Sequence, residues 1–326
     1  MKAIVLAGGH ATRLWPITKN RAKPLLPVNG RPIIDFIIKD LAEKDDIEDI
    51  YISTNEKFSE DFEQYVSEFG YEDKVEVVVE DQNCEEEKPG TIGAIINLLE
   101  CKPSDDYVVI GGDNYYSLDI DEFLDEVNGY PALACYKLDS KEKAKSFGVV
   151  ETNEDHEIVG FQEKPEEPRS TLASTACYFF PEKDLDLFDK YEEHFAQTDI
   201  PADQYLDEPG RLIEWAHKKR TFKGFSFTGE WVDVGTREGY LEAHEAVHGT
   251  GEKIVEGRTR NTQMEGNVYV MEGAEVANSQ LKDCIVFPEA KIEGSSMESS
   301  IVDQKARVRN AEVRESLLGE HSRLFQ

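Results

Sequence analysis

The sequence predicts an α/β fold in two parts, a mostly parallel sheet covered by helices and then a short β-solenoid. Three observations predict it. Apolar runs alternate with amphipathic segments over residues 1–245, a 16-residue repeat follows over residues 254–326, and a length of 326 residues suits about two domains. A hydrophobic content of 39% is enough for a substantial core, which excludes a wholly disordered chain.

Four apolar runs indicate buried strands, at residues 3–7, 49–53, 75–79 and 107–111. Helical spacing follows the first two runs, at Ile33, Ile34, Ile37, Ile38 and Leu41 and then at Phe58, Phe62, Tyr65, Val66 and Phe69. Strands that alternate with helices form right-handed crossovers, which build a mostly parallel sheet. Ligands bind such sheets beyond the carboxyl ends of the strands, so we expect function in the loops after Ala7, Val79 and Gly111.

The pattern changes near residue 254. Aliphatic residues then recur at steps of 6, 5 and 5, at Val270, Val276, Leu281, Val286, Ile292, Met297, Val302, Val308, Val313, Leu318 and Leu324. A small residue stands two positions before each of the last ten, at Ala274, Ser279, Cys284, Ala290, Ser295, Ser300, Ala306, Ala311, Ser316 and Ser322. This regularity predicts three short strands per coil, with one aliphatic side chain per strand inside and a small residue at each corner. Residues 236–248 are expected to form the connecting helix.

The tail resembles the left-handed β-helix built from hexapeptide repeats, with slightly short coils. Such helices often carry acyltransferase activity, which usually needs more coils, a trimeric cleft and a catalytic histidine. This tail has few coils, and its one histidine, His321, lies near the end. We therefore expect a structural or oligomerisation role for it.

Charge and composition exclude several classes of partner. The chain has 67 acidic and 36 basic residues, a net charge of −31, and such a surface repels nucleic acid. The acidity fits either a halophilic source or an ordinary acidic protein. No apolar stretch approaches the ~20 residues of a membrane span, and no secretory pattern opens the chain, so we expect a cytoplasmic protein.

The five cysteines have no CxxC pair and are expected to be buried, reduced thiols: Cys84, Cys101, Cys135, Cys177 and Cys284.

Residues 1–34 contain no acidic residue, although 67 in 326 would place about seven there. Their bases are Lys2, Arg13, Lys19, Arg21, Lys23 and Arg31. They flank the turn LAGGHATRLWP, where Gly8 and Gly9 let the backbone approach a ligand and cradle its phosphates. Arg13 can bind two phosphate oxygens at once. The pattern predicts a polyanion pocket that is neither a P-loop nor a GxGxxG motif.

Residues 6–33, LAGGHATRLWPITKNRAKPLLPVNGRPI, resemble the signature of the sugar-1-phosphate nucleotidyltransferases, often written LAGGxGTRLxPxTxxxxKPLxPVxxKP. Five more blocks follow in that family's order: PGTIGAI (89–95), GGDN (111–114), FGVV (147–150), FQEKP (161–165) and WVDVGT (231–236). The resemblance implies a Rossmann-like nucleotidyltransferase domain over 1–245 and a left-handed β-helix domain over 254–326. Within the family, the chain resembles archaeal glucose-1-phosphate thymidylyl- and uridylyltransferases that carry a C-terminal left-handed β-helix.

The implied reaction transfers a nucleotidyl group from an NTP to a hexose-1-phosphate and releases pyrophosphate. We favour dTTP or UTP with glucose-1-phosphate. The alternatives are GTP with mannose-1-phosphate, or a non-catalytic regulatory subunit of the same fold, which would be expected to lose charged catalytic residues. The NDP-sugar would feed glycan biosynthesis such as protein glycosylation, and a homo-oligomer is expected.

The resemblance also implies a role for each matched residue. Asp113 and Asp233 would bind Mg²⁺, since two carboxylates with phosphates and water suit its octahedral shell. Arg13 and Lys23 would bind the triphosphate, and Lys164 the phosphate of the sugar. The remaining contacts would be Leu6, Gly8, Gly9 and Gly90 with the nucleotide and Gly148 and Glu163 with the sugar.

Two positions depart from the family pattern. Ala11 stands where the signature has glycine, so a positive φ there would cost about 1 kcal/mol, and we expect a compatible loop conformation instead. The acidic segment VEDQNCEEEKPG (79–90), which includes Gln82, replaces a glutamine-containing block typical of thymidylyltransferases. It weakens the prediction of thymidine specificity.

Overall fold

The computed structural model describes residues 1–9, 11–80 and 90–325, which fall into two compact units. The first unit comprises Met1–Gly9, Ile37–Gly112 and Tyr116–Trp231. The second comprises the described residues of 11–36, 113–115 and 232–325. The segment 11–36 therefore belongs to the same compact unit as the repeat region, although more than 200 residues of sequence separate them.

The first unit is built on a nine-stranded sheet. The four predicted strands are β1 (Lys2–Leu6), β4 (Asp49–Thr54), β5 (Val75–Val79) and β6 (Tyr107–Gly111). They are parallel, in the order β6-β1-β4-β5, which confirms the prediction for this half. The other half consists of β8 (Ala132–Lys137), β9 (Gly148–Thr152), β10 (Ile158–Glu163), β11 (Leu172–Phe180) and β12 (Lys223–Phe227). Here β11 runs antiparallel to β6, β8 and β9, so the whole sheet is mixed.

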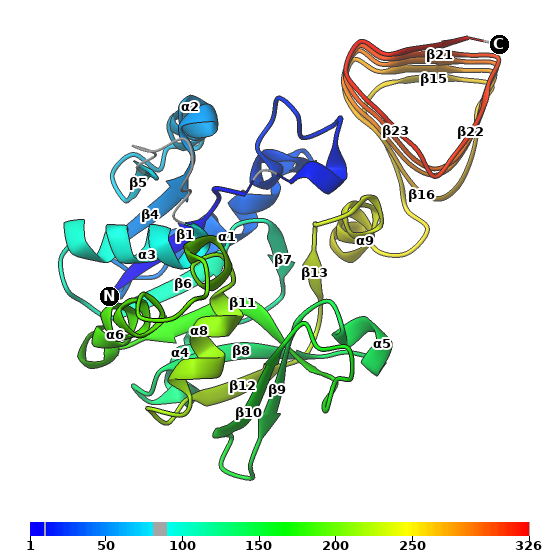
Figure 1. Ribbon diagram of the computed structural model, residues 1–326. Coiled ribbons are helices and arrows are strands. Elements are labelled where there is room, and N and C mark those ends of the chain that lie inside the picture. The colour runs from blue at the N-terminus through cyan, green and yellow to red at the C-terminus, as the bar shows by residue number, and fades with distance from the viewer. Residues whose placement is uncertain (10, 81–89, 326) are drawn as a thin grey trace. The chain divides into compact units, whose positions relative to one another are not determined.

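The two helices that the spacing of apolar residues predicted are present. The predicted apolar residues are buried along α1 (Ile33–Ala42), which begins in the second unit, and along α2 (Ser59–Phe69), except that Phe69 is half-buried. The others are α3 (Gly90–Cys101), α4 (Ile120–Val127), α5 (Lys141–Ala144), α6 (Asp186–Phe195), α7 (Ala202–Tyr205) and α8 (Pro209–Ala216). Ile95 of α3, Phe188 of α6 and Ile213 of α8 share one apolar cluster with the sheet. Figure 1 shows these three helices beside the sheet.

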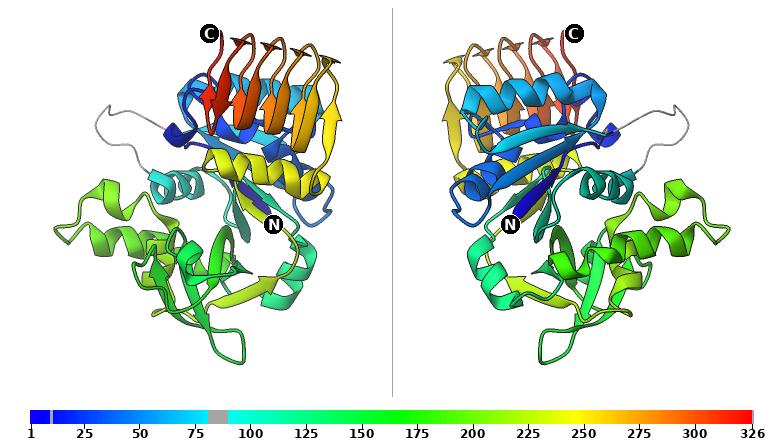
Figure 2. Two further views of the ribbon diagram at one scale, coloured as in Figure 1. Left: turned by 90° about the vertical axis from the view of Figure 1, so that its right-hand side faces the viewer. Right: turned by 90° about the vertical axis from the view of Figure 1, so that its left-hand side faces the viewer.

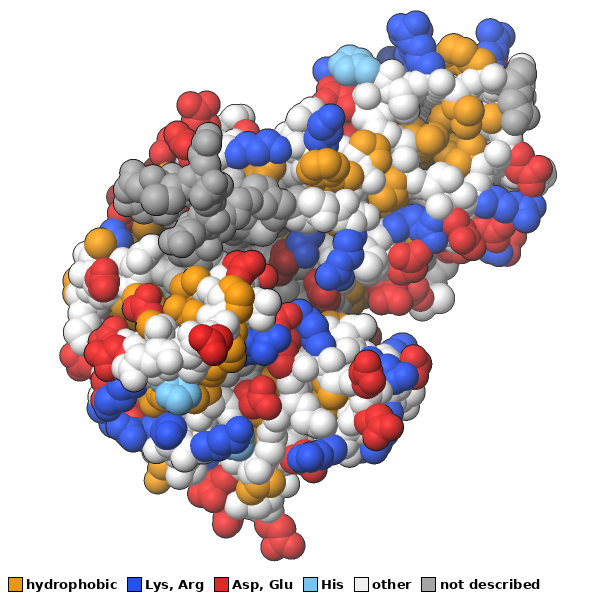
Figure 3. Space-filling model, in the orientation of Figure 1, with side chains coloured by type: hydrophobic (Ala, Val, Ile, Leu, Met, Phe, Trp, Pro, Cys, Tyr) orange, Lys and Arg blue, Asp and Glu red, His pale blue; other side chains and the backbone are white. Residues whose placement is uncertain are grey.

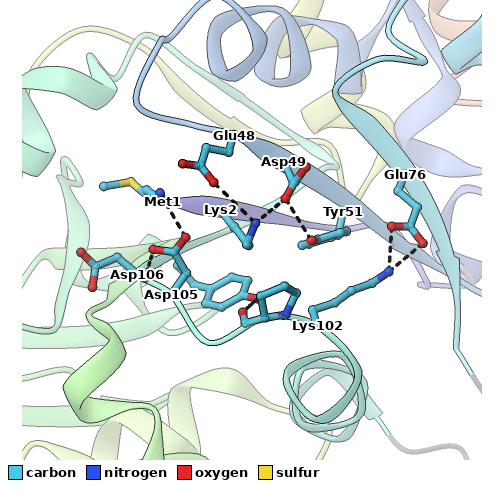
Figure 4. Close-up of polar contacts among 11 residues, drawn as sticks. Met1, Lys2, Glu48, Asp49, Tyr51, Glu76, Lys102, Asp105 and Asp106 are labelled. Carbon is cyan, nitrogen blue, oxygen red and sulfur yellow. Dashed lines mark hydrogen bonds and ion pairs between the residues drawn. The ribbon is translucent and has the colours of Figure 1, made fainter.

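A polar cluster closes the amino ends of β1, β4 and β6 (Figure 4). Lys2, which is 5% exposed, pairs with Asp49 and lies 3.9 Å from Glu48. The hydrogen bond to Asp49 outweighs burial and raises the pKa of Lys2. Lys2 is therefore a structural cation at the end of the sheet opposite to the loops after Ala7 and Gly111. The prediction that Lys2 belongs to the polyanion pocket was wrong.

The second unit contains a left-handed parallel β-helix whose coils stack in chain order (Figures 1 and 2). Its strands are β14 (Lys253–Val255), β15 (Arg258–Arg260), β16 (Gln263–Val270), β17 (Glu275–Ala277), β18 (Gln280–Val286), β19 (Lys291–Glu293), β20 (Ser296–Val302), β21 (Arg307–Arg309), β22 (Glu312–Arg314), β23 (Leu317–Leu318) and β24 (Arg323–Phe325). Every pair is parallel, and Val276, Ile292, Val308 and Leu324 follow one another in register at the predicted 16-residue spacing. The predicted aliphatic residues line an apolar core together with Ala274, Cys284, Ala290, Ala306 and Ala311, although Leu318 and Leu324 in the last coil are only half-buried.

The corners of the β-helix use left-handed backbone. One corner has positive φ at Asn261, Asn278, Gly294 and Asn310, and a second at Gly266, Asp283, Ser299 and Glu315. The third has it at Gly273, Glu289, Lys305 and His321. Outside the coils, charges of opposite sign lie side by side (Figure 3), as in the pairs Lys282–Glu298 at 2.8 Å and Lys291–Glu275 at 3.0 Å.

The remaining elements connect these bodies. They are the short strands β2 (Pro27–Val28), β3 (Arg31–Pro32), β7 (Asn114–Tyr116) and β13 (Trp231–Asp233), and the helix α9 (Arg237–His248). The predicted connecting helix over 236–248 is thus confirmed as α9, with Thr236 as its N-cap. No helix in the described part of the chain is long and apolar enough to span a bilayer.

The described cysteines carry no disulfide. Cys135, Cys177 and Cys284 are buried as expected, and burial raises the pKa of each thiol. Cys101 is exposed at the end of α3, so its predicted burial was wrong. Cys84 lies outside the described residues.

Candidate active site

The charged residues predicted to act on the triphosphate gather in the second unit around Lys23. Lys23 opens a single 3-10 turn, Lys23–Leu25, in which the buried Pro24 holds the backbone. Its side chain is 11% exposed, and its ammonium pairs with Asp113 and lies 3.8 Å from Oδ1 of Asp233. Two carboxylates separated by 120 residues of sequence thus face one lysine.

Strand ends position both carboxylates. Asp113 lies just beyond the carboxyl end of β6, and Asp233 is the last residue of β13. The Val234 N–H donates to the Asp113 carbonyl at 3.2 Å, and the Asn114 amide donates to Asp113 Oδ1 at 2.7 Å. A Cβ at Gly235 would lie 3.1 Å from Asp233 Oδ2, so a larger residue there would crowd this carboxylate. The structure therefore brings together the two residues predicted to bind metal.

The electrostatics keep Lys23 charged. Burial lowers the pKa of Lys23 more than any other single effect, but the Asp113 and Asp233 carboxylates together outweigh it and raise that pKa. Lys23 alone does not neutralise both carboxylates, and Arg13 is the other cation that acts on Lys23. No group of three or more His, Cys, Asp or Glu side chains suited to a metal occurs among the described residues. Two carboxylates with open positions fit Mg²⁺, which usually takes one or two protein carboxylates and fills its shell with phosphates and water.

Arg13 lies on the turn Thr12–Leu14, which the buried Leu14 anchors. Its guanidinium is exposed and forms no ion pair with any residue that the structure describes, and its charge lowers the pKa of nearby Lys23. Ala11 begins the turn in the left-handed region, with φ 49° and ψ 44°. Thr18 and Leu14 both donate to its carbonyl, at 2.8 and 3.1 Å. The expected loop conformation compatible with alanine is not what the structure has at Ala11, because these bonds hold the left-handed turn.

Other bases of the acid-free stretch pair with acidic residues other than Asp113 and Asp233. Arg31 lies 3.2 Å from Asp35, and Arg21 lies 3.3 Å from Asp303. With Lys2 at the far end of the sheet, three of the six bases serve the fold. Arg13 and Lys23 are the two for which the structure supports a role with phosphates.

The predicted nucleotide residues Leu6, Gly8 and Gly9 lie in the first unit, at the carboxyl end of β1. The backbone there is fixed by bonds from the Ala7 N–H to the Ser53 carbonyl at 2.7 Å and from the Asn55 amide to the Gly8 carbonyl at 2.9 Å. The carboxylate of Glu80 lies directly against Gly8, so a side chain at this position would displace the Glu80 carboxylate. A Cβ at Gly9 would have nothing within 4 Å. The sequence placed Glu80 in a loop that was expected to be functional, but its contact with Gly8 was not predicted, since the fold of β5 brings it to this turn.

Gly90 starts α3 with φ +66°. A Cβ there would lie 2.6 Å from the Leu206 carbonyl oxygen, to which the Ile92 N–H donates at 2.7 Å. Glycine at this position is therefore explained by backbone packing within the first unit. The segment 81–89 just before it, including Gln82, lies outside the described residues.

The predicted sugar-phosphate residues also lie together in the first unit. Gly148 and Glu163 are partners across β9 and β10, and a Cβ on Gly148 would lie 3.2 Å from Glu163 Oε2. Burial raises the pKa of Glu163 despite the neighbouring Lys164. Lys164 has a strained φ of 41°, and its ammonium donates to Glu208 at 2.7 Å and lies 3.7 Å from Glu163.

Three residues of this group had no signal in the sequence. Glu208 accepts hydrogen bonds from both Lys164 and Arg211, and Glu163 packs directly against Gly210. The three residues Glu208, Gly210 and Arg211 lie at the start of α8, which packs on β10. Their relation to Lys164 arises from tertiary packing alone.

Comparison with known proteins identifies the family of this chain. A family model described as "Nucleotidyl transferase" matches residues 2–250. The chain belongs to the nucleotidyl transferase family. The match runs from β1 through α9 and so includes Arg13, Lys23, Asp113, Glu163, Lys164 and Asp233.

Several relatives of this nucleotidyl transferase are named for reactions of sugar phosphates. It is 30% identical over 275 residues to the bifunctional protein GlmU of Methanocaldococcus jannaschii, covering 84% of this chain and 61% of the relative. It is 28% identical over 287 residues to a glucose-1-phosphate thymidylyltransferase of Streptomyces griseus, covering 86% and 76%. The chain thus spans about three-fifths of the length of its GlmU relatives.

A solved structure supports the fold. A Bacillus anthracis protein described as a glucose-1-phosphate thymidylyltransferase, crystallised with sucrose, matches with a TM-score of 0.62 and 29% identity. The match covers 75% of the nucleotidyl transferase described here and 94% of the other chain.

Proposed function

We propose that this nucleotidyl transferase catalyses Mg²⁺-dependent transfer of a nucleotidyl group from an NTP to a hexose-1-phosphate, with dTTP or UTP and glucose-1-phosphate as the favoured pair. The observation that carries the proposal is Lys23, held as a buried cation by Asp113 and Asp233 beside the exposed Arg13. This arrangement suits a nucleoside triphosphate with a divalent cation. The names of the relatives support sugar phosphates as the second substrate.

Residues of the second unit would act on the triphosphate. Asp113 and Asp233 would hold Mg²⁺, which when bound neutralises phosphate charge. Arg13 would bind oxygens of the departing pyrophosphate with its planar fork, and Lys23 those around the α-phosphorus. The sugar-phosphate oxygen would form a bond to the α-phosphorus as the bond to pyrophosphate breaks. Alignment and charge neutralisation account for most of the catalysis of such a step.

Residues of the first unit would bind the hexose-1-phosphate. Lys164 would exchange its hydrogen bond with Glu208 for one with the phosphate, since both acceptors are anionic oxygens. Glu163, buried against Gly148 and Gly210, would accept hydrogen bonds from sugar hydroxyls. Leu6, Gly8, Gly9 and Gly90 would contact the nucleotide.

A grid of reactions tests the proposal. Pyrophosphate release would be measured with Mg²⁺ for ATP, GTP, CTP, UTP and dTTP against glucose-, mannose-, galactose- and N-acetylglucosamine-1-phosphate, in low and in molar KCl. The expected result is strongest turnover with dTTP or UTP and glucose-1-phosphate, and near-complete loss in Asp113→Asn. A blank grid from folded protein that still binds an NDP-sugar would replace catalysis with a regulatory role. The salt dependence tests whether the acidity is a halophilic adaptation.

One observation favours the second candidate, GTP with mannose-1-phosphate. Glu80 places a carboxylate against Gly8, held by a hydrogen bond from Ser53 at 3.1 Å. A carboxylate can accept two hydrogen bonds from the N1–H and N2–H of guanine, whereas uracil and thymine offer one N–H. Glu80→Gln would lower kcat/KM for GTP far more than for UTP if guanine is bound here.

Two further proposals concern assembly. We propose that the chain forms a homo-oligomer and that residues 1–245 and 254–326 are its domains in the order of the sequence. Light scattering tests the first, and limited proteolysis near residue 250 tests the second.

A further inference from the structure

The segment that carries Arg13 and Lys23 packs on the outside of the β-helix. Leu14, Ile17 and Leu26 of this segment are buried in one apolar cluster, to which the β-helix also contributes. Its members from the β-helix include Tyr269, Ile285 and Ile301, which are spaced by 16 residues and alternate with the inward-facing residues of β16, β18 and β20. The β-helix therefore supplies part of the core on which the phosphate-binding turn rests.

One position, which repeats on successive coils beside this cluster, changes from an apolar residue to a carboxylate. Met271, Phe287, Asp303 and Gly319 each follow the aligned residues Val270, Val286, Val302 and Leu318. Met271 and Phe287 are buried members of the cluster, at 4% and 1% exposed. Asp303, at 3% exposed, places a carboxylate where its neighbours are apolar. A buried carboxylate is costly unless it is paired, so this position calls for a partner.

The partner of Asp303 is Arg21, 282 residues earlier in the chain. Arg21 Nη1 donates to Asp303 Oδ1 at 3.3 Å, and the guanidinium lies 4.9 Å from the ring centroid of Phe287. The Gln304 N–H also donates to Asp303 Oδ1, at 2.8 Å. On the next coil, a Cβ at Gly319 would lie 2.6 Å from Pro16. The segment is thus held on three successive coils, at Phe287, Asp303 and Gly319.

We propose that Asp303 is a positioning residue for nucleotidyl transfer: through Arg21 it fixes the backbone two residues before Lys23 and so holds the Lys23 ammonium against Asp113 and Asp233. This inference rests on the proposed function. It makes the β-helix part of the triphosphate-binding machinery rather than a separate appendage, because the pair joins a coil to the turn that bears the catalytic lysine. A displacement of about 1 Å in such a group can cost about 10²-fold in rate.

The decisive experiment compares steady-state kinetics of Asp303→Asn with the wild type. We expect the KM for NTP to rise about tenfold and kcat to fall about tenfold. The KM for hexose-1-phosphate should stay within about twofold, because Glu163 and Lys164 belong to the other compact unit. The matched control is Glu298→Gln, which removes an exposed ion pair with Lys282 from the same β-helix and should leave all three constants unchanged.

A double-mutant cycle separates positioning from general damage. If Asp303 acts through Arg21, Arg21→Met with Asp303→Asn should be no worse than Arg21→Met alone, and Arg21→Lys should recover part of the activity. Wild-type kinetics in Asp303→Asn would overturn the proposal. So would an equal loss for both substrates with a lowered Tm, since that pattern describes instability alone.

A measurement without turnover keeps this inference distinct from the proposed function. A displaced Lys23 would leave Asp113 and Asp233 less neutralised, so added Mg²⁺ should raise the Tm of Asp303→Asn more than that of the wild type. If the wild type is inactive but this difference appears, the proposed function fails and the positioning role stands. An active wild type whose Mg²⁺-induced shift and kinetics match those of Asp303→Asn would overturn the positioning role alone.

Discussion

Lys164 donates a hydrogen bond to Glu208 at 2.7 Å, across 44 residues of sequence. The carboxylate also accepts a bond from Arg211 at 2.9 Å, so Glu208 holds two cations at the start of α8. The pKa of Lys164 is raised because these carboxylate interactions outweigh the opposing effect of burial. Lys164 is thus a fixed cation before any ligand arrives, and the phosphate of a hexose-1-phosphate has only to replace one anionic acceptor with another.

We expect Lys164→Met to raise the KM for hexose-1-phosphate about 10- to 100-fold, which corresponds to the roughly 1.5–3 kcal/mol of a hydrogen bond to a charged group. The KM for NTP should hardly change. Lys143→Met, which removes an exposed pair with Asp139 on the same unit, is the control. Steady-state kinetics in both substrates checks this, and an equal rise in both KM values would contradict the assignment of Lys164.

Replacing Lys23 by methionine should make the thermal stability of the protein depend on Mg²⁺. Without the ammonium, Asp113 and Asp233 repel each other, so the Tm without metal should fall while the increase caused by 10 mM Mg²⁺ should exceed that of the wild type. Adding Asp113→Asn to Lys23→Met should remove most of that increase. Differential scanning calorimetry with and without Mg²⁺ measures both. A Tm of Lys23→Met that does not respond to Mg²⁺ would show that these carboxylates bind no metal.

Ala11→Gly should stabilise the protein. Ala11 is held at φ 49°, where a side chain costs about 1–2 kcal/mol, and the greater freedom of glycine in the unfolded chain offsets part of that gain. We expect a net increase of about 0.5–1 kcal/mol in the free energy of unfolding, measured by urea denaturation. Ala22→Gly is the matched control, since Ala22 has φ −61° and should lose about 0.5–1 kcal/mol on the same change. Equal effects at the two positions would contradict the argument.

Stability should fall in mild acid because of His244. Burial, together with a smaller effect of neighbouring His248, lowers the pKa of His244 to about 3, so the unfolded chain binds a proton below pH ~6.5 that the folded chain excludes. Each pH unit below ~6.5 should cost up to about 1.4 kcal/mol from this one group. Burial also lowers the pKa of His248, which Glu252 and Glu256 partly offset.

The contribution of His244 is isolated by comparing unfolding at pH 7 and pH 5. His244→Phe should fit among Tyr240, Tyr269 and His248 and should lose about 2 kcal/mol less than the wild type over this range. His321→Asn, at an exposed histidine, should behave as the wild type. A wild-type curve as flat as that of His244→Phe would show that His244 is protonated in the folded protein.

Local patterns in the sequence predicted most of the fold. The four parallel strands and the 16-residue coils were predicted because each depends on side chains close in sequence. The antiparallel half was not, since β11 pairs with β6, β8 and β9 across long intervals. The left-handed corners were also missed, because Glu289, Lys305 and Glu315 are residues that rarely adopt positive φ.

The residues of the candidate site were also predicted only in part. Motif residues such as Asp113, Asp233 and Lys23 were predicted, and they lie together. Their partners from distant elements were not, because no local pattern links Glu208 to Lys164 or Asp303 to Arg21. Counting bases in the acid-free stretch overestimated the anion pocket, since the acids that neutralise Lys2, Arg21 and Arg31 lie outside that stretch.

The contact between Arg21 and Asp303 also sets an order of events during synthesis. At about 5–20 residues per second, a ribosome needs roughly 15–60 s to add the 282 residues between them. Throughout that interval Leu14 and Ile17 lack the apolar cover that the coils supply. A truncated product that ends before the coil with Asp303 would therefore display an uncovered apolar surface beside the turn that carries Lys23, and that turn would not be anchored. Such a fragment is a natural substrate for chaperones and proteases, so quality control would remove chains that stop early.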